Sequence, residues 1–210
     1  MMKLVYQPHD LLWVNHLSDD EQPPAWFHLT DLISRPVVVR RAPYQADRIA
    51  VGIRGFSRSQ RHASLVTPQA IVRHLTPEQL VEQQGWYTQY QNHPLPHWQT
   101  LADIDDIFRS YSLAWGITGS LAFELATGMR TANQQSDIDL RILAPTPLDK
   151  QRASELAQQL TTLAQRPDVQ IETALGAFAL SEWLQTSGSV MIKSNQGPFL
   201  SANPWQTDSE

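Results

Sequence analysis

The sequence contains no cysteine, which excludes disulfide bonds, thiolate catalysis and zinc–thiolate centres. It also has no apolar run of signal-peptide or membrane-span length, so we expect a soluble, cytoplasmic protein without a membrane partner. Glycine is scarce, with nine residues against fourteen prolines and seven tryptophans, and this composition favours fixed turns and aromatic packing over disorder. A chain of 210 residues is long enough for one large or two small domains.

Lysine is absent from residues 35–73, where eight arginines accompany a single acid, Asp47. Residues 1–100 hold nine Lys/Arg and eight Asp/Glu, whereas residues 101–210 hold seven and thirteen. A planar guanidinium binds phosphate or carboxylate through two parallel hydrogen bonds. The charge distribution therefore predicts a basic N-terminal half that binds anions and an acidic C-terminal half that binds metal.

The first chemical signal is a turn between a predicted strand and a predicted helix. Residues 113–118 are apolar enough for a buried strand and lead into Gly119-Ser120, and residues 121–127 have the apolar spacing of a short helix. Backbone N–H groups at such a helix N-terminus bind phosphate oxygens. We therefore expect Gly119 and Ser120 to bind phosphate.

The second signal is a pair of acids on one strand. Acidic, basic and apolar residues alternate over 137–143, so Asp137 and Asp139 are predicted to share one strand face, about 7 Å apart. Paired carboxylates offer oxygen ligands to Mg²⁺, or to Mn²⁺ in its place. Two such ions can bind the attacking and leaving oxygens of an in-line displacement. Either motif alone is usually an ordinary turn or two solvated acids, but together they favour phosphate chemistry.

Two further residues extend this predicted site. Residues 169–173 alternate as a strand, and Glu172 would supply a third carboxylate if that strand lies beside the aspartate pair. Glu172 would then be a metal ligand or a general base, although a lone strand glutamate is as often solvated. Residues 176–185, between this strand and the next, are predicted to form a helix. Lys193, near the end of a strand predicted over 189–194, is expected to reach a phosphate.

A cluster of arginines follows a predicted hairpin in the N-terminal half. The strands over 36–42 and 49–55 lead to Arg54, Arg58 and Arg61, which are predicted to bind a polyphosphate. The alternative is an exposed basic loop whose surface ion pairs contribute little. No helix-turn-helix or aromatic-interleaved pattern accompanies the arginines, so nucleic acid is not expected as a partner.

The pattern of elements predicts an α/β (α+β) protein with two domains. Residues 86–100 show little periodicity and are interpreted as a connector, which places the domain boundary near residue 95. Residues 1–95 would form a smaller, basic α+β domain that binds the substrate or a partner protein. Residues 96–210 would form the catalytic domain, a mixed sheet flanked by helices, including long ones over 101–110 and 148–165.

A Gly-Ser turn, a short helix, an Asp-x-Asp strand and a later strand carboxylate together resemble the nucleotidyltransferase superfamily. Nearly the whole chain is also similar to the phosphoribosyl-dephospho-CoA transferases of malonate decarboxylase. The stretches that carry this second resemblance are His9-Asp-Leu-Leu-Trp13, Pro36-Val-Val-Val-Arg-Arg41, Val51-Gly-Ile-Arg-Gly55, Arg58-Ser-Gln-Arg61, Thr76-Pro-Glu78, Gly176-Ala-Phe-Ala-Leu180 with Glu182-Trp183, and Gly197-Pro198 with Pro204-Trp205.

The second resemblance implies a defined reaction. The donor would be 2′-(5″-triphosphoribosyl)-3′-dephospho-CoA, the acceptor a serine of the apo acyl-carrier subunit of malonate decarboxylase, and the leaving group diphosphate. Asp137 and Asp139 would hold Mg²⁺, expected as two ions, and Gly119 and Ser120 would bind the β- and γ-phosphates. Glu172 would be the base or a shared ligand.

The role of the arginines and two alternative functions remain open. The arginines of residues 54–61 would bind further phosphate or an acidic surface, and the charge of the N-terminal half suggests a docking face for an acidic carrier. One alternative is another Mg²⁺-dependent nucleotidyltransferase, which adenylylates or uridylylates a small molecule or a protein. A second alternative is an RNA-binding or regulatory module without activity, although the presence of both carboxylates argues against it.

Overall fold

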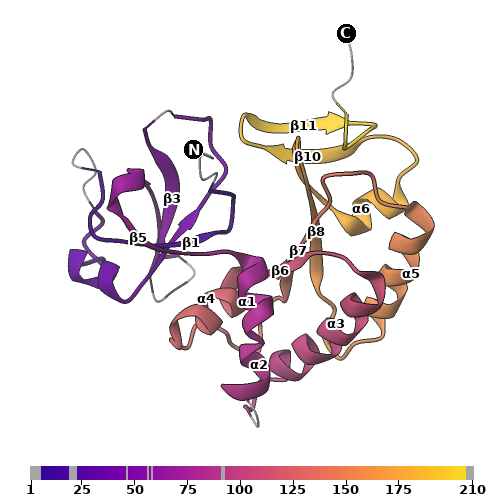
Figure 1. Cartoon of the computed structure of the whole chain (residues 1–210), viewed down its shortest axis with the longest axis horizontal. Helices are drawn as coiled ribbons and strands as arrows, with labels where there is room; N and C mark the ends of the chain where they lie inside the picture. The colour runs from indigo at the N-terminus through magenta and orange to yellow at the C-terminus, as the bar shows by residue number, and fades with distance from the viewer. Residues whose placement is uncertain are drawn as a thin grey trace. The chain divides into compact units, whose positions relative to one another are not determined.

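The computed structural model describes residues 6–18, 23–45, 47–55, 57, 59–90 and 93–206. The chain divides into two compact units, Met1–Thr76 and Pro77–Glu210. Each unit has its own sheet, and the α-helices among the described residues belong to the second unit, so the chain as a whole has the predicted α+β class (Figure 1). No helix among the described residues has both the length and the apolar character needed to cross a membrane.

The first unit is built on a five-stranded antiparallel sheet in the order β4-β3-β2-β1-β5. The predicted hairpin is present as β2 and β3, with Val38 paired to Gly52. A short 3₁₀ turn, η1, precedes the hairpin, and a second such turn, η2, precedes β5. The bounds are β1 (Leu11–Val14), η1 (Leu29–Ile33), β2 (Val37–Val39), β3 (Ile49–Arg54), β4 (Arg61–Val66), η2 (Pro68–Ala70) and β5 (Ile71–Leu75).

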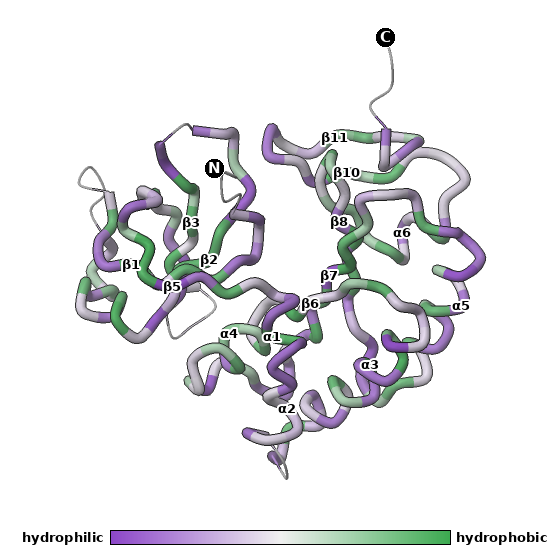
Figure 2. Tube along the Cα trace, in the orientation of Figure 1, coloured by the Kyte–Doolittle hydropathy of each residue, from purple (hydrophilic) through white to green (hydrophobic). Residues whose placement is uncertain are grey.

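Alternating branched residues explain how this sheet forms its core. Val37 and Val39 of β2 and Val51 and Ile53 of β3 are buried, and all four belong to one hydrophobic cluster. β-Branched side chains restrict χ1 and favour extended backbone, so these residues both form the strands and fill the core. In Figure 2 the hydrophobic residues follow β1 and β2 in this unit and β7 in the second.

The second unit is built on a six-stranded mixed sheet in the order β11-β10-β9-β8-β7-β6, in which β7 and β8 run parallel. Gly176–Ala179 is a strand, β9, paired antiparallel with β8, so the helix predicted over 176–185 is restricted to α6. The strand bounds are β6 (Trp115–Ile117), β7 (Asp139–Leu143), β8 (Asp168–Thr173), β9 (Gly176–Ala179), β10 (Val190–Ser194) and β11 (Gly197–Ser201). The helix bounds are α1 (Pro77–Gln83), α2 (Gly85–Thr88), α3 (His97–Tyr111), α4 (Gly119–Thr127), α5 (Lys150–Thr161) and α6 (Leu180–Gln185).

One face of the second sheet is apolar and lies under helices. Leu140 and Ile142 of β7, Ile171 of β8 and Phe178 of β9 are fully or nearly fully buried. Helices α3, α5 and α6 follow one another along one side of this sheet (Figure 1). Alternate residues of the same strands, Asp139 among them, point to the opposite face because successive side chains of a strand alternate.

The boundary between the units lies at residue 76 rather than near residue 95. Helix α1 packs on β6, and α2 packs on α3, so both helices belong to the second unit. The stretch interpreted as a connector contains α2 and the beginning of α3. Its aromatic residues lack helical periodicity because they pack within a cluster rather than along one helix face.

A buried ion pair fixes α1 to the sheet. Arg141 of β7 is 3% exposed and donates from Nε to Oε1 and from Nη2 to Oε2 of Glu78, both at 2.7 Å. Gly116 of β6 pairs with Arg141 and leaves room for this contact, since a Cβ at Gly116 would lie 2.7 Å from the Glu78 Oε1. Two parallel, charge-assisted hydrogen bonds thus join the first turn of α1 to the strand that carries Asp139.

Replacing Glu78 with alanine is expected to lower the free energy of unfolding by about 3–5 kcal/mol, because the buried Arg141 charge loses its bidentate partner. Urea unfolding followed by circular dichroism measures the change. The matched control is Asp106→Ala on α3, whose carboxylate is 71% exposed and contacts Arg109 at 3.4 Å, and whose loss should cost less than about 1 kcal/mol. Equal losses in the free energy of unfolding for the two variants would show that the buried pair contributes no more than the exposed one.

Candidate active site

The Gly-Ser turn and the aspartate pair meet where β6 ends and β7 begins. The backbone N–H of Thr118 donates to the Asp139 carbonyl at 2.9 Å, and Gly119 follows as the first residue of α4. Gly119 has a φ of +69°, and the Asp139 carboxylate occupies the position that a Cβ at Gly119 would take. The structure therefore places the Asp139 side chain directly against the turn, which brings the two motifs together.

Helix α4 presents its N-terminus at this point. It runs over Gly119–Thr127, buries its apolar face, and ends at Gly128 in a left-handed conformation with φ +73°. The N–H groups of its first turn carry partial positive charge and favour an anion. Ser120, the second residue of the helix, is partly exposed, so this N-terminus is open to a phosphate-bearing ligand.

Asp137 lies just before β7 and is exposed, while Asp139 is partly exposed. The extended pairing continues through Ile138, because its carbonyl accepts the Asp168 N–H at 2.8 Å. Ile138 is buried on the apolar face, so the two aspartates on either side of it project from the opposite face. This agrees with the predicted alternation.

The strand that carries Glu172 does lie beside β7, but its register separates the two carboxylates. Asp139 pairs with Asp168, and Glu172 pairs with Leu143. Because each strand residue advances about 3.3 Å, Glu172 lies about 13 Å further along the sheet than Asp139. The third carboxylate predicted from sequence is therefore on the expected face but not next to the pair, and the neighbouring position belongs to Asp168.

Glu172 instead lies in line with Lys193. Both residues pair with Ala177 of β9, from opposite sides. Directly opposed residues in neighbouring strands point to the same face. A glutamate and an exposed lysine thus lie on one face of the sheet, on either side of the buried Ala177.

The arginines predicted to bind phosphate belong to the first unit. Arg54, at the end of β3, pairs directly with Arg61, at the start of β4, so their guanidinium groups extend from one end of the same hairpin. Arg61 is exposed and Arg54 is partly exposed. Arg58 lies outside the described residues.

Within the part of the chain that the structure describes, no three or more His, Cys, Asp or Glu side chains are arranged to hold a metal ion by themselves. This arrangement is compatible with Mg²⁺, which is usually bound through one or two carboxylates together with substrate phosphates. Asp137 and Asp139 are hard oxygen donors beside a helix N-terminus, so their chemistry suits an ion that arrives with a polyphosphate.

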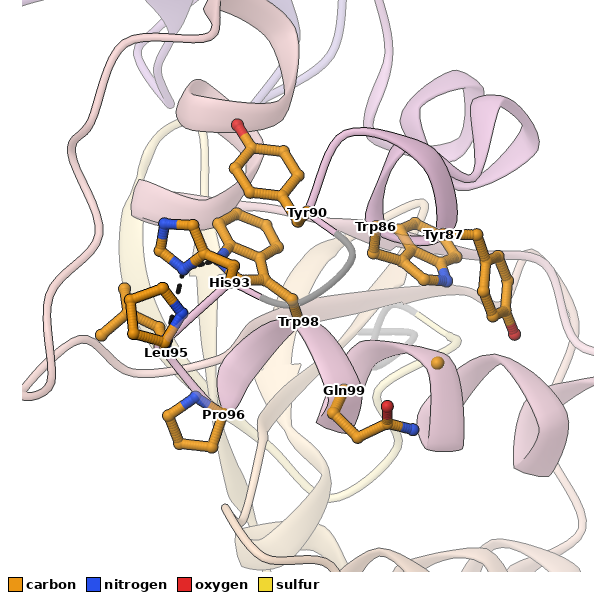
Figure 3. Close-up of a pocket in the computed structure, with 10 residues that line it drawn as sticks. Trp86, Tyr87, Tyr90, His93, Leu95, Pro96, Trp98 and Gln99 are labelled. Atoms are coloured by element: carbon orange, nitrogen blue, oxygen red, sulfur yellow. Dashed lines mark hydrogen bonds between the residues drawn. The ribbon is translucent and has the colours of Figure 1, made fainter.

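An aromatic pocket of about 450 Å³ also belongs to the second unit (Figure 3). Tyr90 and Trp98 stack with ring centroids 3.9 Å apart, and His93 Nδ1 accepts N–H groups from Trp98 and Leu95. The Tyr90 hydroxyl donates to the Glu124 backbone carbonyl at 3.1 Å, which joins the pocket wall to α4. Burial, together with the negative charge of Glu124, raises the pKa of Tyr90 to about 12.

Replacing Tyr90 with phenylalanine is expected to change how stability depends on alkaline pH. The unfolded phenol ionises near pH 10, at about its ordinary pKa, whereas the folded phenol ionises near 12. Tyr90 therefore stabilises the wild type fully below pH 10, and this contribution is lost as pH rises through 12. Urea unfolding at pH 9 and pH 11.5 should show a wild-type advantage that shrinks at the higher pH, and a constant difference would contradict the raised pKa.

The sequence did not single out three charged residues that shape this site. Glu78 appeared only in a stretch that carries the family resemblance, and Arg141 looked like one more alternating strand position, although it lies two residues after Asp139 on the same face. Glu124 was the only charged residue in the apolar run of α4, and it is almost completely buried. For Glu124 the available signal was a charge at a helix position that core packing would give to an apolar residue, whereas Glu78 and Arg141 fitted the patterns of their own elements and gave no such signal.

Comparison with known proteins identifies the family. The model of the C-terminal domain of phosphoribosyl-dephospho-CoA transferase MdcG matches residues 80–204, and that of the N-terminal domain matches residues 7–77. The chain belongs to the phosphoribosyl-dephospho-CoA transferase family. This membership makes it a transferase, and the two matched ranges follow the division of the structure into two units.

Individual relatives are similar over nearly their full length. Phosphoribosyl-dephospho-CoA transferase of Azotobacter vinelandii is 39% identical, with 97% of this chain and 96% of that protein covered. The transferases of Klebsiella pneumoniae strain 342 and Pseudomonas putida are 39% and 40% identical, covering 96% and 95% of this chain and 97% and 95% of theirs. No solved structure matches the chain.

Proposed function

We propose that this transferase moves the phosphoribosyl-dephospho-CoA group from 2′-(5″-triphosphoribosyl)-3′-dephospho-CoA to a serine of the apo acyl-carrier subunit of malonate decarboxylase. The serine hydroxyl attacks the α-phosphorus, the bond to the β-phosphate oxygen breaks, and diphosphate leaves. The observation that carries the proposal is the contact between the Asp139 carboxylate and Gly119 at the N-terminus of α4, in a chain of this family.

The second unit is proposed to be catalytic. The N–H groups at the start of α4 would bind the β- and γ-phosphates, since a helix N-terminus stabilises anions. Asp137 and Asp139 would hold Mg²⁺ against the phosphates, and two ions are the expected complement. When bound there, Mg²⁺ neutralises negative charge that develops on the leaving diphosphate.

Glu172 and Lys193 are proposed to contact the substrate from the face of the sheet that they share. Their common pairing with Ala177 supports this proposal, because a carboxylate and an ammonium would then lie two strands apart on one face. If Glu172 accepts the proton of the attacking hydroxyl, the acceptor must enter from this side of the sheet. Asp168, opposite Asp139, is the competing candidate for that role.

The first unit is proposed to dock the carrier. Its eight arginines over residues 35–73 suit an acidic protein surface, and acyl carriers are commonly acidic. Arg54 and Arg61, paired at one end of the β3–β4 hairpin, are its proposed central contacts, with Arg58 between them in sequence. Docking that depends on such charges should weaken with salt.

The proposed reaction is tested by incubating the protein with Mg²⁺, the triphosphoribosyl donor and purified apo carrier subunit. Intact-mass spectrometry should show the addition of one phosphoribosyl-dephospho-CoA, and the addition should require the acceptor serine. An unchanged carrier mass would overturn the proposal. Transfer of AMP or UMP from a nucleoside triphosphate would support another nucleotidyltransferase activity, and RNA binding without any transfer would support a regulatory module.

A further inference from the structure

A segment without regular secondary structure, residues 128–138, joins the end of α4 to the start of β7. It therefore connects the Gly-Ser turn to the aspartate pair. Glu124 of α4 is 1% exposed, and its Oε2 accepts the backbone N–H groups of Thr131 at 2.8 Å and Ala132 at 2.7 Å. One buried carboxylate oxygen thus fixes the middle of this connecting segment.

Two other contacts fix the segment on either side of that point. The Thr131 hydroxyl donates to the Ser120 backbone carbonyl at 2.8 Å, which ties the segment back to the Gly-Ser turn. His97, the first residue of α3, is fully buried, and its Nε2 lies 2.7 Å from the Ser136 carbonyl. Because a carbonyl only accepts hydrogen bonds, His97 donates here, one residue before Asp137.

We infer that Glu124, Thr131 and His97 are positioning residues that hold the 128–138 segment so that Asp137 and the Gly-Ser turn face one ligand. This inference rests on the proposed function for the identity of that ligand. Asp137 lies between Ser136, whose carbonyl contacts His97, and β7, so the course of the segment contributes to its placement. A displacement of 1 Å at such a group can lower a rate by about 100-fold.

The burial of Glu124 favours this role over simple packing. Leu121 and Leu125, its neighbours on α4, are buried, and an apolar residue at position 124 would avoid the cost of burying a carboxylate. Among the described residues, the side chain makes two hydrogen bonds, and both go to the connecting segment. The carboxylate therefore orders the segment, and the charge-assisted bonds offset its burial.

The inference is tested with four variants in the carrier assay, in Mn²⁺ binding followed by electron paramagnetic resonance, and in hydrogen exchange of residues 128–136. Glu124→Ala leaves two N–H groups unpaired and should lower transfer about 100-fold. Glu124→Gln keeps an oxygen that can accept both bonds and should restore transfer to within about threefold of the wild type. Thr131→Val removes only the bond to Ser120 and should lower transfer about tenfold, with weaker Mn²⁺ binding and faster exchange.

The matched control is Glu182→Ala on α6. Its exposed side chain also accepts one backbone N–H, that of Met191 at 3.0 Å, but away from the segment, so transfer and Mn²⁺ binding should stay unchanged. If Glu124→Ala does not fold, Thr131→Val carries the test alone. Wild-type transfer and Mn²⁺ binding in a folded Thr131→Val variant would overturn the inference. Absence of transfer by the wild type would instead overturn the proposed function, and hydrogen exchange would still report on the segment.

Discussion

An Asp139→Asn variant should fold normally and lose transfer by at least about 1,000-fold. The carboxylate is seated against Gly119 at the start of α4, where a metal-bound polyphosphate is proposed to lie. A metal ligand contributes several kcal/mol to a phosphoryl-transfer transition state, and each 1.36 kcal/mol is about tenfold in rate. The amide preserves the shape of the side chain but removes its charge, so transfer should fall without a comparable loss of stability.

The measurement is the initial rate of mass addition to the carrier, together with thermal unfolding of each variant. Asp106→Asn on α3, a solvent-exposed aspartate, is the control and should react like the wild type. Comparing Glu172→Gln with Asp168→Asn then tells which of the two β8 carboxylates takes part in the reaction. Retention of full activity by Asp139→Asn would contradict the proposed site, whatever the other variants show.

A Gly119→Ala variant is expected to lose transfer by about 100-fold or more, because the new methyl group requires the Asp139 carboxylate to move. The φ of +69° at this position also disfavours alanine, at a cost of about 1–2 kcal/mol. The backbone strain lowers the free energy of unfolding, whereas the displaced Asp139 carboxylate lowers the transfer rate. The transfer rate should therefore fall much more than the stability. The assay is the same mass-addition rate, measured at saturating donor and Mg²⁺.

The chain offers a close control at the other end of the same helix. Gly128 has a φ of +73°, and a Cβ there would meet nothing within 4 Å. Gly128→Ala should therefore lose a similar amount of stability, about 1–2 kcal/mol, and keep most of its activity. Equal activity losses in the two glycine variants would mean that backbone strain, and not contact with Asp139, explains the effect.

Local patterns predicted the elements of this site well. Strand alternation placed both aspartates on one face, and the apolar run after the Gly-Ser turn predicted the helix α4. These signals succeed because each depends on neighbours within a few residues along the chain. The hairpin of β2 and β3 could be predicted for the same reason.

Features that depend on pairing between distant segments could not be predicted from local patterns. Alternation placed Glu172 on the correct face, but only the parallel register with β7 shows that it lies opposite Leu143. A strand can shift by two residues and keep the same side chains on each face, so the pattern alone does not fix the register. The unit boundary was missed because the packing of α1 on β6, which assigns α1 to the second unit, joins segments that are distant in the sequence.

The Glu78–Arg141 pair restricts where the gene could be divided during evolution or in the laboratory. Glu78 is the second residue of the second unit, and it neutralises the buried guanidinium of Arg141 on β7, the strand that carries Asp139. A fragment that begins at residue 96 would carry Arg141 without this partner and would also lose the helix that covers Gly116. Gene fission, domain exchange and fusion to a carrier should therefore succeed only with cuts that leave Pro77 and the residues after it attached to the sheet.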